Sequence, residues 1–289
     1  MKVLITGADG QLGSSLLLTA PAHVQLVACS RAELDIADVA QVRRVVADHL
    51  PNAIINAAAY TAVDQAEIEA DQAWRVNAAG PRYLAQVAAQ FGVRLLHVST
   101  DYVFAGDSAR PYRPKDATVP QNNYGRSKLH GEGAVCSLLP NDSVVLRTAW
   151  VYGASGRNFL RTMLRLMREK GSVRVVADQV GSPTATHSIS DVLWRFAAEP
   201  SHHGIFHFTD AGVASWYDFA VAIAEEACTQ GLLNSDVQVL PITTEEYPTP
   251  ARRPRYSVLD CTATDAALQL TRKHWRTQLR RVMKEMEVA

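Results

Sequence analysis

A tyrosine and a lysine four residues apart, Tyr124 and Lys128, are residues whose types and spacing could do chemistry. On a helix, this i, i+4 spacing places both side chains on one face. A tyrosine hydroxyl has an unperturbed pKa of about 10, and a nearby ammonium group favours its phenolate. We therefore expect Lys128 to bring the pKa of Tyr124 closer to neutral. Tyr124 could then donate a proton to an alkoxide that develops during reduction of a carbonyl, with the Thr100 hydroxyl on the same oxygen.

Three glycines near the N-terminus have a spacing that suits a phosphate-binding turn. Gly7, Gly10 and Gly13 follow the apolar run Val3–Thr6 and open the helical stretch Gln11–Leu18. Glycines let the chain turn tightly and approach a pyrophosphate at the positive end of the following helix. The strand–turn–helix context favours dinucleotide binding over a turn that is only structural.

The end of the second expected strand reads Cys29-Ser30-Arg31. At this place an acidic residue binds the adenosine ribose, whereas a basic residue tolerates a 2′-phosphate. The sequence shows no carboxylate at the strand end, so Ser30 and Arg31 favour NADPH, or use of both cofactors, over strict NADH. The alternative is that Arg31 is a solvated loop charge.

A tyrosine and a lysine at this spacing also occur by chance on many helices, as an aromatic anchor beside a solvated lysine. Here they are accompanied by Ser99-Thr100-Asp101, which follows an apolar strand. Open α/β sheets bind their ligands at the carboxyl ends of the strands. The glycine turn, this segment and the Tyr124/Lys128 pair are therefore expected to form one site.

These groups must be positioned by alternating strands and helices. Apolar, β-prone runs alternate with helical patterns, which predicts a parallel sheet covered on both faces, the α/β doubly wound parallel sheet of the Rossmann type. The expected strands are Val3–Thr6, Val24–Cys29, Ala53–Asn56, Arg94–Ser99 and Ser143–Arg147, and the expected helices are Gln11–Leu18, Val39–His49, Gln72–Phe91 and Tyr124–Leu138.

The later part of the chain has shorter strands and loops richer in proline and polar residues. We expect residues 1–155, with some later segments returning, to form the dinucleotide-binding domain, and residues 156–289 to form mainly a smaller substrate-binding lobe. The polar stretch Thr243–Pro254 is expected to be a long loop. The later expected elements are helices Phe159–Glu169, Ser188–Glu199 and Trp216–Thr229, and strands Arg174–Ala177 and Ile205–Thr209.

Composition limits the class of protein. The chain has 289 residues, with 29 Lys+Arg against 29 Asp+Glu and 47% hydrophobic residues, so that binding to nucleic acid by bulk charge is a poor interpretation. No apolar run approaches a membrane span and the N-terminus reads as a strand, so we expect a cytoplasmic protein that binds no membrane. The cysteines are widely spaced and His202–His203 reads as a surface loop, so no metal site is predicted.

Further motifs run in order through nearly the whole chain. On them the sequence resembles the extended short-chain dehydrogenase/reductase superfamily, and within it the dTDP-4-dehydrorhamnose reductase family. The motifs are GADGQLG at 7–13, LD at 34–35, NAAAYT at 56–61, VNAAGP at 76–81, STDYVFAG at 99–106, YGRSK at 124–128, RTAWVYG at 147–153, DQVGSPT at 178–184 and RRPRYSVLD at 252–260.

This resemblance implies reduction of the C4 keto group of dTDP-4-dehydro-beta-L-rhamnose to dTDP-beta-L-rhamnose, the last step of dTDP-L-rhamnose synthesis, with NADPH or NADH. It implies that the glycine turn binds the pyrophosphate, that Asp35 with Ile36 meets the adenine, and that three small residues let the cofactor pass the sheet edge. From the residue pattern and the resemblance together, the expected cofactor-binding residues are Gly7, Gly10, Gln11, Leu12, Ser30, Arg31, Asp35, Ile36, Ala57, Ala58, Ala59, Tyr124 and Lys128.

The resemblance also implies a set of substrate-binding residues. Thr100, Asp101 and Tyr124 match positions that contact the sugar, as does Trp150, whose alternative role is a core or lobe-interface tryptophan. Asn158, Gln179 and Arg253 are expected to bind the nucleotide end, with Arg253 clamping the diphosphate. Arg252 and Arg255 could share that role, and the alternative is a solvated basic loop.

One departure concerns metal and assembly. Some members of the family are dimers bridged by magnesium through acidic residues, one of them just after the glycine turn, where this chain has Ser14-Ser15-Leu16. No metal is therefore predicted, and the chain is expected to be a monomer or a homodimer. Three alternatives to the implied activity stay open: a nucleotide-sugar epimerase or dehydratase, a reductase of another dTDP-4-keto-6-deoxysugar, and a non-catalytic regulatory subunit on the same fold.

Overall fold

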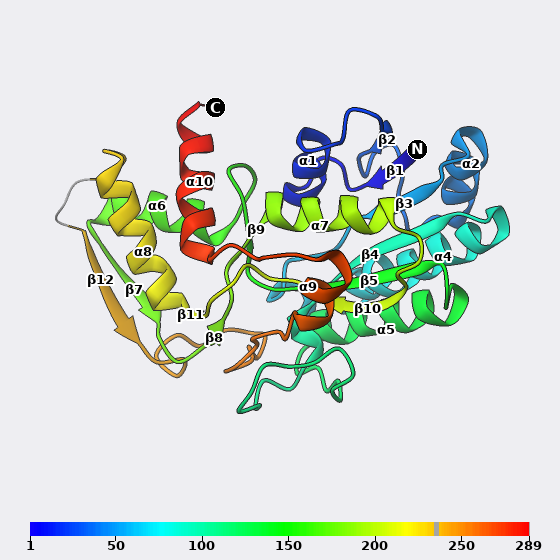
Figure 1. Ribbon diagram of the computed structural model, residues 1–289. Coiled ribbons are helices and arrows are strands. Elements are labelled where there is room, and N and C mark those ends of the chain that lie inside the picture. The colour runs from blue at the N-terminus through cyan, green and yellow to red at the C-terminus, as the bar shows by residue number, and fades with distance from the viewer. Residues whose placement is uncertain (234–236, 289) are drawn as a thin grey trace.

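Six parallel strands form the central sheet, in the order β10-β5-β4-β3-β1-β2. The structure, a computed structural model, describes residues 1–233 and 237–288. Helices cover both faces of the sheet (Figure 1), so the predicted doubly wound α/β class is confirmed. The strands of the sheet are β1 Lys2–Thr6, β2 Gln25–Cys29, β3 Ala53–Asn56, β4 Arg94–Thr100, β5 Ser143–Thr148 and β10 Gly204–His207.

Neighbouring side chains along each strand enter different cores because they point to opposite faces of the sheet. Val3 and Ile5 pack with α1 and α7 on one face. Leu4, between them, packs with α2 and α4 on the other face, and α5 contributes Val135 to the same core. The helices are α1 Gln11–Leu18, α2 Val39–His49, α4 Gly80–Phe91, α5 Asn123–Leu138 and α7 Thr186–Ala198.

The strand order reverses at β1, because β2 lies on one side of it and β3 on the other. Successive crossovers therefore leave the sheet in opposite directions, and sheets of this kind bind ligands at the carboxyl ends of the strands beside the reversal, here β1 and β3. Strand β4 also ends at this edge, and the segment after it begins there. The glycine turn, the alanines Ala57–Ala59 and Thr100-Asp101, all predicted to bind cofactor or substrate, lie at these strand ends.

The predicted single helix Gln72–Phe91 is wrong, because the chain here is divided. It forms α3 Ala70–Trp74, a π-helical turn at Arg75–Ala79, and α4. Pro81 at the start of α4 has no N–H for a regular helical bond. In the π-turn, the buried Asn77 exchanges hydrogen bonds with the backbone of Tyr60 at 2.9 and 3.0 Å, which ties the turn to the segment after β3.

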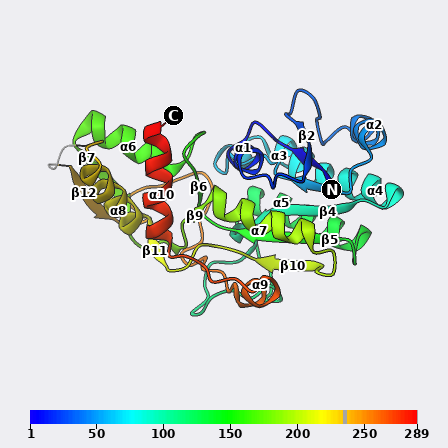
Figure 2. The same ribbon diagram turned by 45° about the horizontal axis from the view of Figure 1, so that its top comes forward.

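A smaller lobe lies beside the sheet and has its own apolar core (Figures 1 and 2). Strand β12 pairs with β7 there, in parallel. The C-terminal helix α10 stands on the side of the lobe that faces the main sheet. The lobe contains α6 Phe159–Lys170, β7 Ser172–Val176, α8 Trp216–Thr229, β12 Gln238–Ile242 and α10 Trp275–Val288, with the short strands β6 Val151–Tyr152, β8 Val180–Gly181, β9 Thr184–Ala185 and β11 Ala214–Ser215.

The chain returns to the main sheet after residue 155. Helix α7 packs on the same face as α1, and β10 is the edge strand beside β5. The short helix α9 Thr262–Leu268 contributes Leu268 to that core. Residues 243–254 contain no helix or strand. Within the described residues, no helix is long and apolar enough to cross a membrane.

Candidate active site

The first turn of α5 carries Tyr124 to the end of β4. The N-cap Asn122 accepts a hydrogen bond from the N–H of Gly125 at 2.8 Å, which starts the helix. A Cβ at Gly125 would lie 2.2 Å from the carbonyl oxygen of Tyr102, so only glycine allows α5 to approach the turn after β4 so closely. This approach brings the hydroxyl of Tyr124 into hydrogen-bonding contact with that of Thr100.

Burial shifts the pKa values of Tyr124 and Lys128. It raises the pKa of Tyr124 to about 12, although the hydrogen-bonding contact with Thr100 favours the phenolate. It lowers the pKa of Lys128 to about 8. The Lys128 Nζ donates to the carbonyl oxygen of Val98 at 2.6 Å. The expectation that Lys128 lowers the pKa of Tyr124 is therefore wrong for this structure, because burial of the phenol dominates, and Tyr124 keeps its proton at neutral pH.

Asp101 is buried beside this pair. The Thr100 hydroxyl donates to its Oδ1 at 3.1 Å. Burial raises the pKa of Asp101 to about 6, against hydrogen bonds from Ser257 and Thr100 that favour the carboxylate. The structure thus brings Thr100, Asp101, Tyr124 and Lys128 together at one sheet edge.

The glycine turn has the geometry that a pyrophosphate requires. Gly7 has a φ of 67°, and a Cβ there would lie 2.7 Å from the Cα of Ala58. The turn therefore touches the segment of small residues after β3, where Ala57 and Ala59 are also only partly buried. No side chain caps the N-terminus of α1, so the N–H groups of Gln11 and Leu12 are left for an anion. These features fit a dinucleotide cofactor.

A carboxylate lies at the end of β2, and the expectation that none would be there is wrong. Glu33 Oε2 accepts a hydrogen bond from the N–H of Ser30 at 2.7 Å, because the chain folds back after the strand. Arg31 is exposed beside it. Farther along, Asp35 accepts a hydrogen bond from Arg75 at 2.5 Å, and Ile36 packs so closely on Gly80 that a Cβ there would lie 2.7 Å from its Cδ1.

Trp150 lies at the junction between the two parts of the molecule. Its indole stacks on that of Trp216, with ring centroids 3.5 Å apart and planes 3° from parallel. A Cβ at Gly181 would lie 2.5 Å from this indole. Trp150 also has a φ of 48°, which is strained for a bulky residue. Trp150 thus packs at the lobe interface, the role that was the alternative to sugar contact. A sugar could reach only the part of its indole that Trp216 and Gly181 leave uncovered.

Arg253 and Gln179 hold the long loop at 243–254. Gln179 is buried and donates from Nε2 to the Thr244 hydroxyl at 3.1 Å. The guanidinium of Arg253 makes two hydrogen bonds to Asp64, at 2.7 and 3.0 Å, and is largely shielded from solvent. Arg252 and Arg255 are exposed. The structure therefore distinguishes Arg253 from its two neighbours, which the sequence could not do.

Asn158 lies at the glycine turn and not with Gln179 and Arg253. It caps α6 by accepting from the N–H of Arg161 at 3.0 Å. Its Nδ2 donates to Oε1 of Gln11 at 2.9 Å. The Gln11 side chain in turn donates to the carbonyl oxygen of Arg157 at 3.0 Å. Asn158 thus joins the lobe to the glycine turn, and its expected contact with the nucleotide end stays a prediction.

Sequence reasoning missed a buried ion pair under the catalytic strand. Glu132 lies one helical turn after Lys128 and pairs with Arg147 on β5 at 2.7 Å, with both side chains almost fully buried. Ser99 on β4 donates to the same carboxylate at 2.5 Å. The sequence did carry a signal for this pair. Glu132 follows Lys128 by four residues, as Lys128 follows Tyr124, so that its carboxylate lies on the same face of α5.

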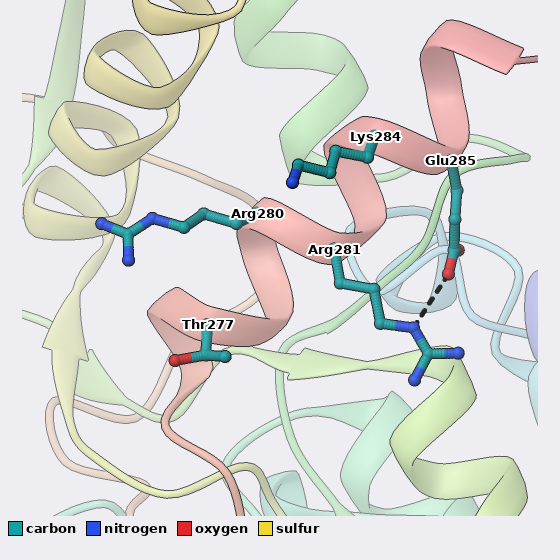
Figure 3. Close-up of a pocket in the computed structure, with 5 residues that line it drawn as sticks. All are labelled: Thr277, Arg280, Arg281, Lys284 and Glu285. Carbon is teal, nitrogen blue, oxygen red and sulfur yellow. Dashed lines mark hydrogen bonds and ion pairs between the residues drawn. The ribbon is translucent and has the colours of Figure 1, made fainter.

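A separate surface hollow lies along α10 and contains none of the predicted site residues (Figure 3). Arg281 pairs with Glu285 one turn away at 3.1 Å, and Arg280 points away from them, toward Glu226 on α8, at 2.8 Å. The exposed pair of Arg281 with Glu285 is usual on a solvated helix face, whereas Glu226 is buried. Within the described residues, no group of three or more His, Cys, Asp or Glu side chains could hold a metal ion.

Comparisons with known proteins identify the family. The family model described as "RmlD substrate binding domain" matches residues 1–288. A protein of Aggregatibacter actinomycetemcomitans named dTDP-4-dehydrorhamnose reductase is 43% identical, over 97% of this chain and 98% of its own length. This chain belongs to the dTDP-4-dehydrorhamnose reductase family. The membership implied by the motifs is thereby confirmed.

Two further members of the family are informative about cofactor and substrate. The crystal structure of the Bacillus anthracis dTDP-4-dehydrorhamnose reductase in complex with NADP matches with a TM-score of 0.93 and 38% identity, over 98% of this chain and 99% of that one. A Streptomyces niveus protein named dTDP-4-keto-6-deoxy-D-glucose reductase is 42% identical, over 96% of this chain and 94% of its own length. Family members of similar identity to this chain thus carry names for different 4-keto sugars.

Proposed function

We propose that this chain reduces the C4 keto group of dTDP-4-dehydro-beta-L-rhamnose to give dTDP-beta-L-rhamnose, the last step of dTDP-L-rhamnose synthesis. The observation that carries the proposal is the grouping of Tyr124 and Lys128 on α5 with Thr100 at the end of β4, in a chain of this family. Lys128 completes the set one turn later on α5.

The chemistry divides between the cofactor and the protein. A reduced nicotinamide, NADPH or NADH, supplies a hydride to C4 of the sugar. Tyr124 gives its hydroxyl proton to the C4 oxygen, and Thr100 donates a hydrogen bond to the same oxygen as negative charge develops there. Solvent then returns a proton to the phenolate that remains, and Lys128 holds the ribose of the nicotinamide.

The proposed cofactor site is built from the first half of the chain. The uncapped end of α1 supports binding of the pyrophosphate, and Gly7 keeps the turn close to the small residues after β3. The residues proposed to hold the cofactor are Gly7, Gly10, Gln11, Leu12, Ser30, Arg31, Asp35, Ile36, Ala57, Ala58, Ala59, Tyr124 and Lys128.

The proposed substrate site extends from the catalytic pair toward the long loop. The sugar lies against Thr100, Asp101 and the accessible part of Trp150. The diphosphate lies at Arg253, in a cleft of about 840 Å³ between the segments 105–108 and 244–256. Gln179 acts by holding Thr244 in that loop, and we assign Asn158 a supporting role at the glycine turn as well as its predicted contact with the nucleotide end.

The wider assignments follow the same proposal. Residues 1–155, with α7 and β10 returning, bind the cofactor, and the rest of 156–289 forms mainly the substrate lobe. The protein works in the cytoplasm, as a monomer or homodimer, on a small-molecule dTDP-sugar.

A spectrophotometric assay tests the proposal. The substrate is generated in place by the preceding enzymes of the pathway, and consumption of NADPH and NADH is followed before the product sugar is identified. We expect oxidation of the cofactor with dTDP-L-rhamnose as the product. No oxidation by protein that binds the cofactor would contradict the proposal and favour a regulatory subunit.

A reductase of another dTDP-4-keto-6-deoxysugar is the second candidate. The Streptomyces niveus relative supports it, because its name differs in the sugar although its identity to this chain is about as high. A panel of dTDP-4-keto sugars, compared by kcat/KM, separates the two candidates. A clearly higher value for a sugar other than the rhamnose precursor would favour the second.

A further inference from the structure

Asp64 and Arg253 join two segments that are far apart in the chain. Asp64 follows β3, at the cofactor edge of the sheet, and Arg253 belongs to the long loop of the substrate side. The Arg253 Nη2 donates to Asp64 Oδ2 at 2.7 Å, and Nη1 donates to Oδ1 at 3.0 Å. The N–H of Ala251 donates to the same Oδ1 at 3.2 Å, so one carboxylate holds both the side chain and the backbone of the loop.

The pair uses only one edge of the guanidinium. An arginine has five N–H donors in a planar fork. The two N–H groups of Nη1 donate to Asp64 and to the carbonyl oxygen of Ala251, the latter at 3.3 Å. One N–H group of Nη2 donates to Asp64. Among the described residues, Nε makes no hydrogen bond that would occupy the other edge. The edge formed by Nε and Nη2 keeps the two parallel donors that recognise phosphate oxygens in pairs.

The guanidinium lies near the proposed catalytic centre. Its positive charge opposes the rise that burial causes in the pKa of Tyr102. The Tyr102 ring meets that of Tyr124 edge-on, with centroids 5.6 Å apart. Arg253 also lines the cleft assigned to the substrate. Arg253 and the proposed proton donor Tyr124 thus both lie near Tyr102.

We propose that Asp64 is a positioning residue, which holds the Arg253 guanidinium so that its Nε–Nη2 edge faces the diphosphate of the substrate. This inference rests on the proposed function and assigns it a further residue. A side chain already held in its binding conformation loses less entropy when the ligand binds. The Asp64 carboxylate also repels a diphosphate, but its charge is paired with the arginine, so the positioning effect dominates.

Calorimetric titration of the full chain with dTDP tests this role without requiring turnover. Thymidine, which lacks the phosphates, serves as the comparison ligand. We expect Asp64→Ala to weaken dTDP binding about tenfold or more, and Arg253→Ala to weaken it at least as much. The double variant should bind dTDP no more weakly than Arg253→Ala alone, because Asp64 acts through the arginine. Affinity for thymidine should stay unchanged in all variants.

Two further variants test whether the loss of dTDP binding is only a general effect of removing a structural ion pair. Asp64→Asn keeps one acceptor for the arginine and should give an intermediate loss. Asp265 lies on α9, forms a partly buried pair with Arg272 and is not among the residues that line the cleft. Asp265→Ala should therefore leave dTDP binding unchanged.

The outcomes separate this inference from the proposed function. Unchanged or tighter dTDP binding in Asp64→Ala would overturn the positioning role alone, as would losses that simply add in the double variant. Wild-type protein that binds no dTDP would contradict the proposed function, and the role of Asp64 with it.

Discussion

At the level of single residues, burial shifts the pKa values of Tyr124 and Lys128 in opposite directions, and both shifts suit the proposed reduction. The pKa of the phenol is raised to about 12, so the proton that reduction consumes is present at neutral pH. The pKa of the ammonium is lowered to about 8, so most of its charge is still present there. A neutral phenol, on Tyr124, and a charged ammonium group, on Lys128, are thus both available near the carboxyl end of β4.

Replacing Tyr124 by phenylalanine tests its role as the proton donor. The variant keeps the ring and loses only the hydroxyl, so we expect turnover to fall roughly 10²- to 10⁴-fold while the dissociation constant of the cofactor stays nearly constant. Turnover and cofactor binding are measured on the same preparation. Tyr83→Phe, on α4, serves as the control and should be fully active; unchanged turnover in Tyr124→Phe would remove this residue from the mechanism.

The lowered pKa of Lys128 predicts a pH dependence. The ammonium is charged below about pH 8 and loses its charge above it, well before an ordinary lysine would. We therefore expect kcat/KM for the cofactor, which reports groups of the free enzyme, to fall as the pH rises through about 8. In Lys128→Arg the charge persists through this range, and the fall near pH 8 should disappear. The same inflection in both proteins would assign it to another group.

Arg31 and Glu33 place opposite charges at the end of β2. If Arg31 meets a 2′-phosphate, Arg31→Asp should raise the KM for NADPH about 10- to 100-fold and that for NADH by less than about threefold. Steady-state kinetics with both cofactors measure this difference. Equal losses for NADPH and NADH would mean that Arg31 does not contact the phosphate, and that it is a solvated charge beside Glu33.

At the level of elements, one face of α5 carries the site and its support. Tyr124, Lys128 and Glu132 follow each other at i, i+4 and i+8. Through Ser99 and Arg147, the Glu132 carboxylate bonds to β4 and to β5. The helix is thereby fixed against the two strands whose ends form the substrate side of the site.

This buried pair should matter for stability. Glu132→Gln leaves the Arg147 guanidinium buried without its counter-charge, and we expect a loss of about 3–5 kcal/mol in the free energy of unfolding. Urea denaturation measures the loss. Glu169→Gln, which breaks an exposed pair with Arg165 on α6, is the matched control and should cost less than about 1 kcal/mol. Similar losses in the two variants would contradict the supporting role of Glu132.

Local pattern predicted many of these elements well. The helices Gln11–Leu18, Val39–His49 and Trp216–Thr229 and the strand Ala53–Asn56 have the bounds expected from the sequence, because apolar periodicity and flanking glycine or polar residues define them. The interruption before α4 depends on the contact of Asn77 with Tyr60, seventeen residues away, and no local pattern reports it.

At the level of the whole molecule, the site lies where the lobe meets the sheet. Asn158 and Gln11 join the two parts on the cofactor side, and Arg253 and Asp64 join them on the substrate side. The glycine turn, Ser30-Arg31 and Thr100-Asp101 could be placed at strand ends from the sequence, because each ends or directly follows a strand. The later site residues could not be placed, because pairs such as Asp64 with Arg253 depend on how the chain folds back. Likewise, α7 and β10 follow the same alternating pattern as the lobe, although α7 packs on the main sheet and β10 pairs with β5.

The central claim is hydride transfer to C4 of the dTDP-sugar with proton transfer from Tyr124. Its most direct test is a reaction with cofactor deuterated at the transferred position of the nicotinamide, followed by nuclear magnetic resonance of the product. The account predicts deuterium at C4 of dTDP-beta-L-rhamnose, and hardly any labelled product from Tyr124→Phe over the same time. Deuterium at another carbon, or labelled product at the wild-type rate from the variant, would contradict it.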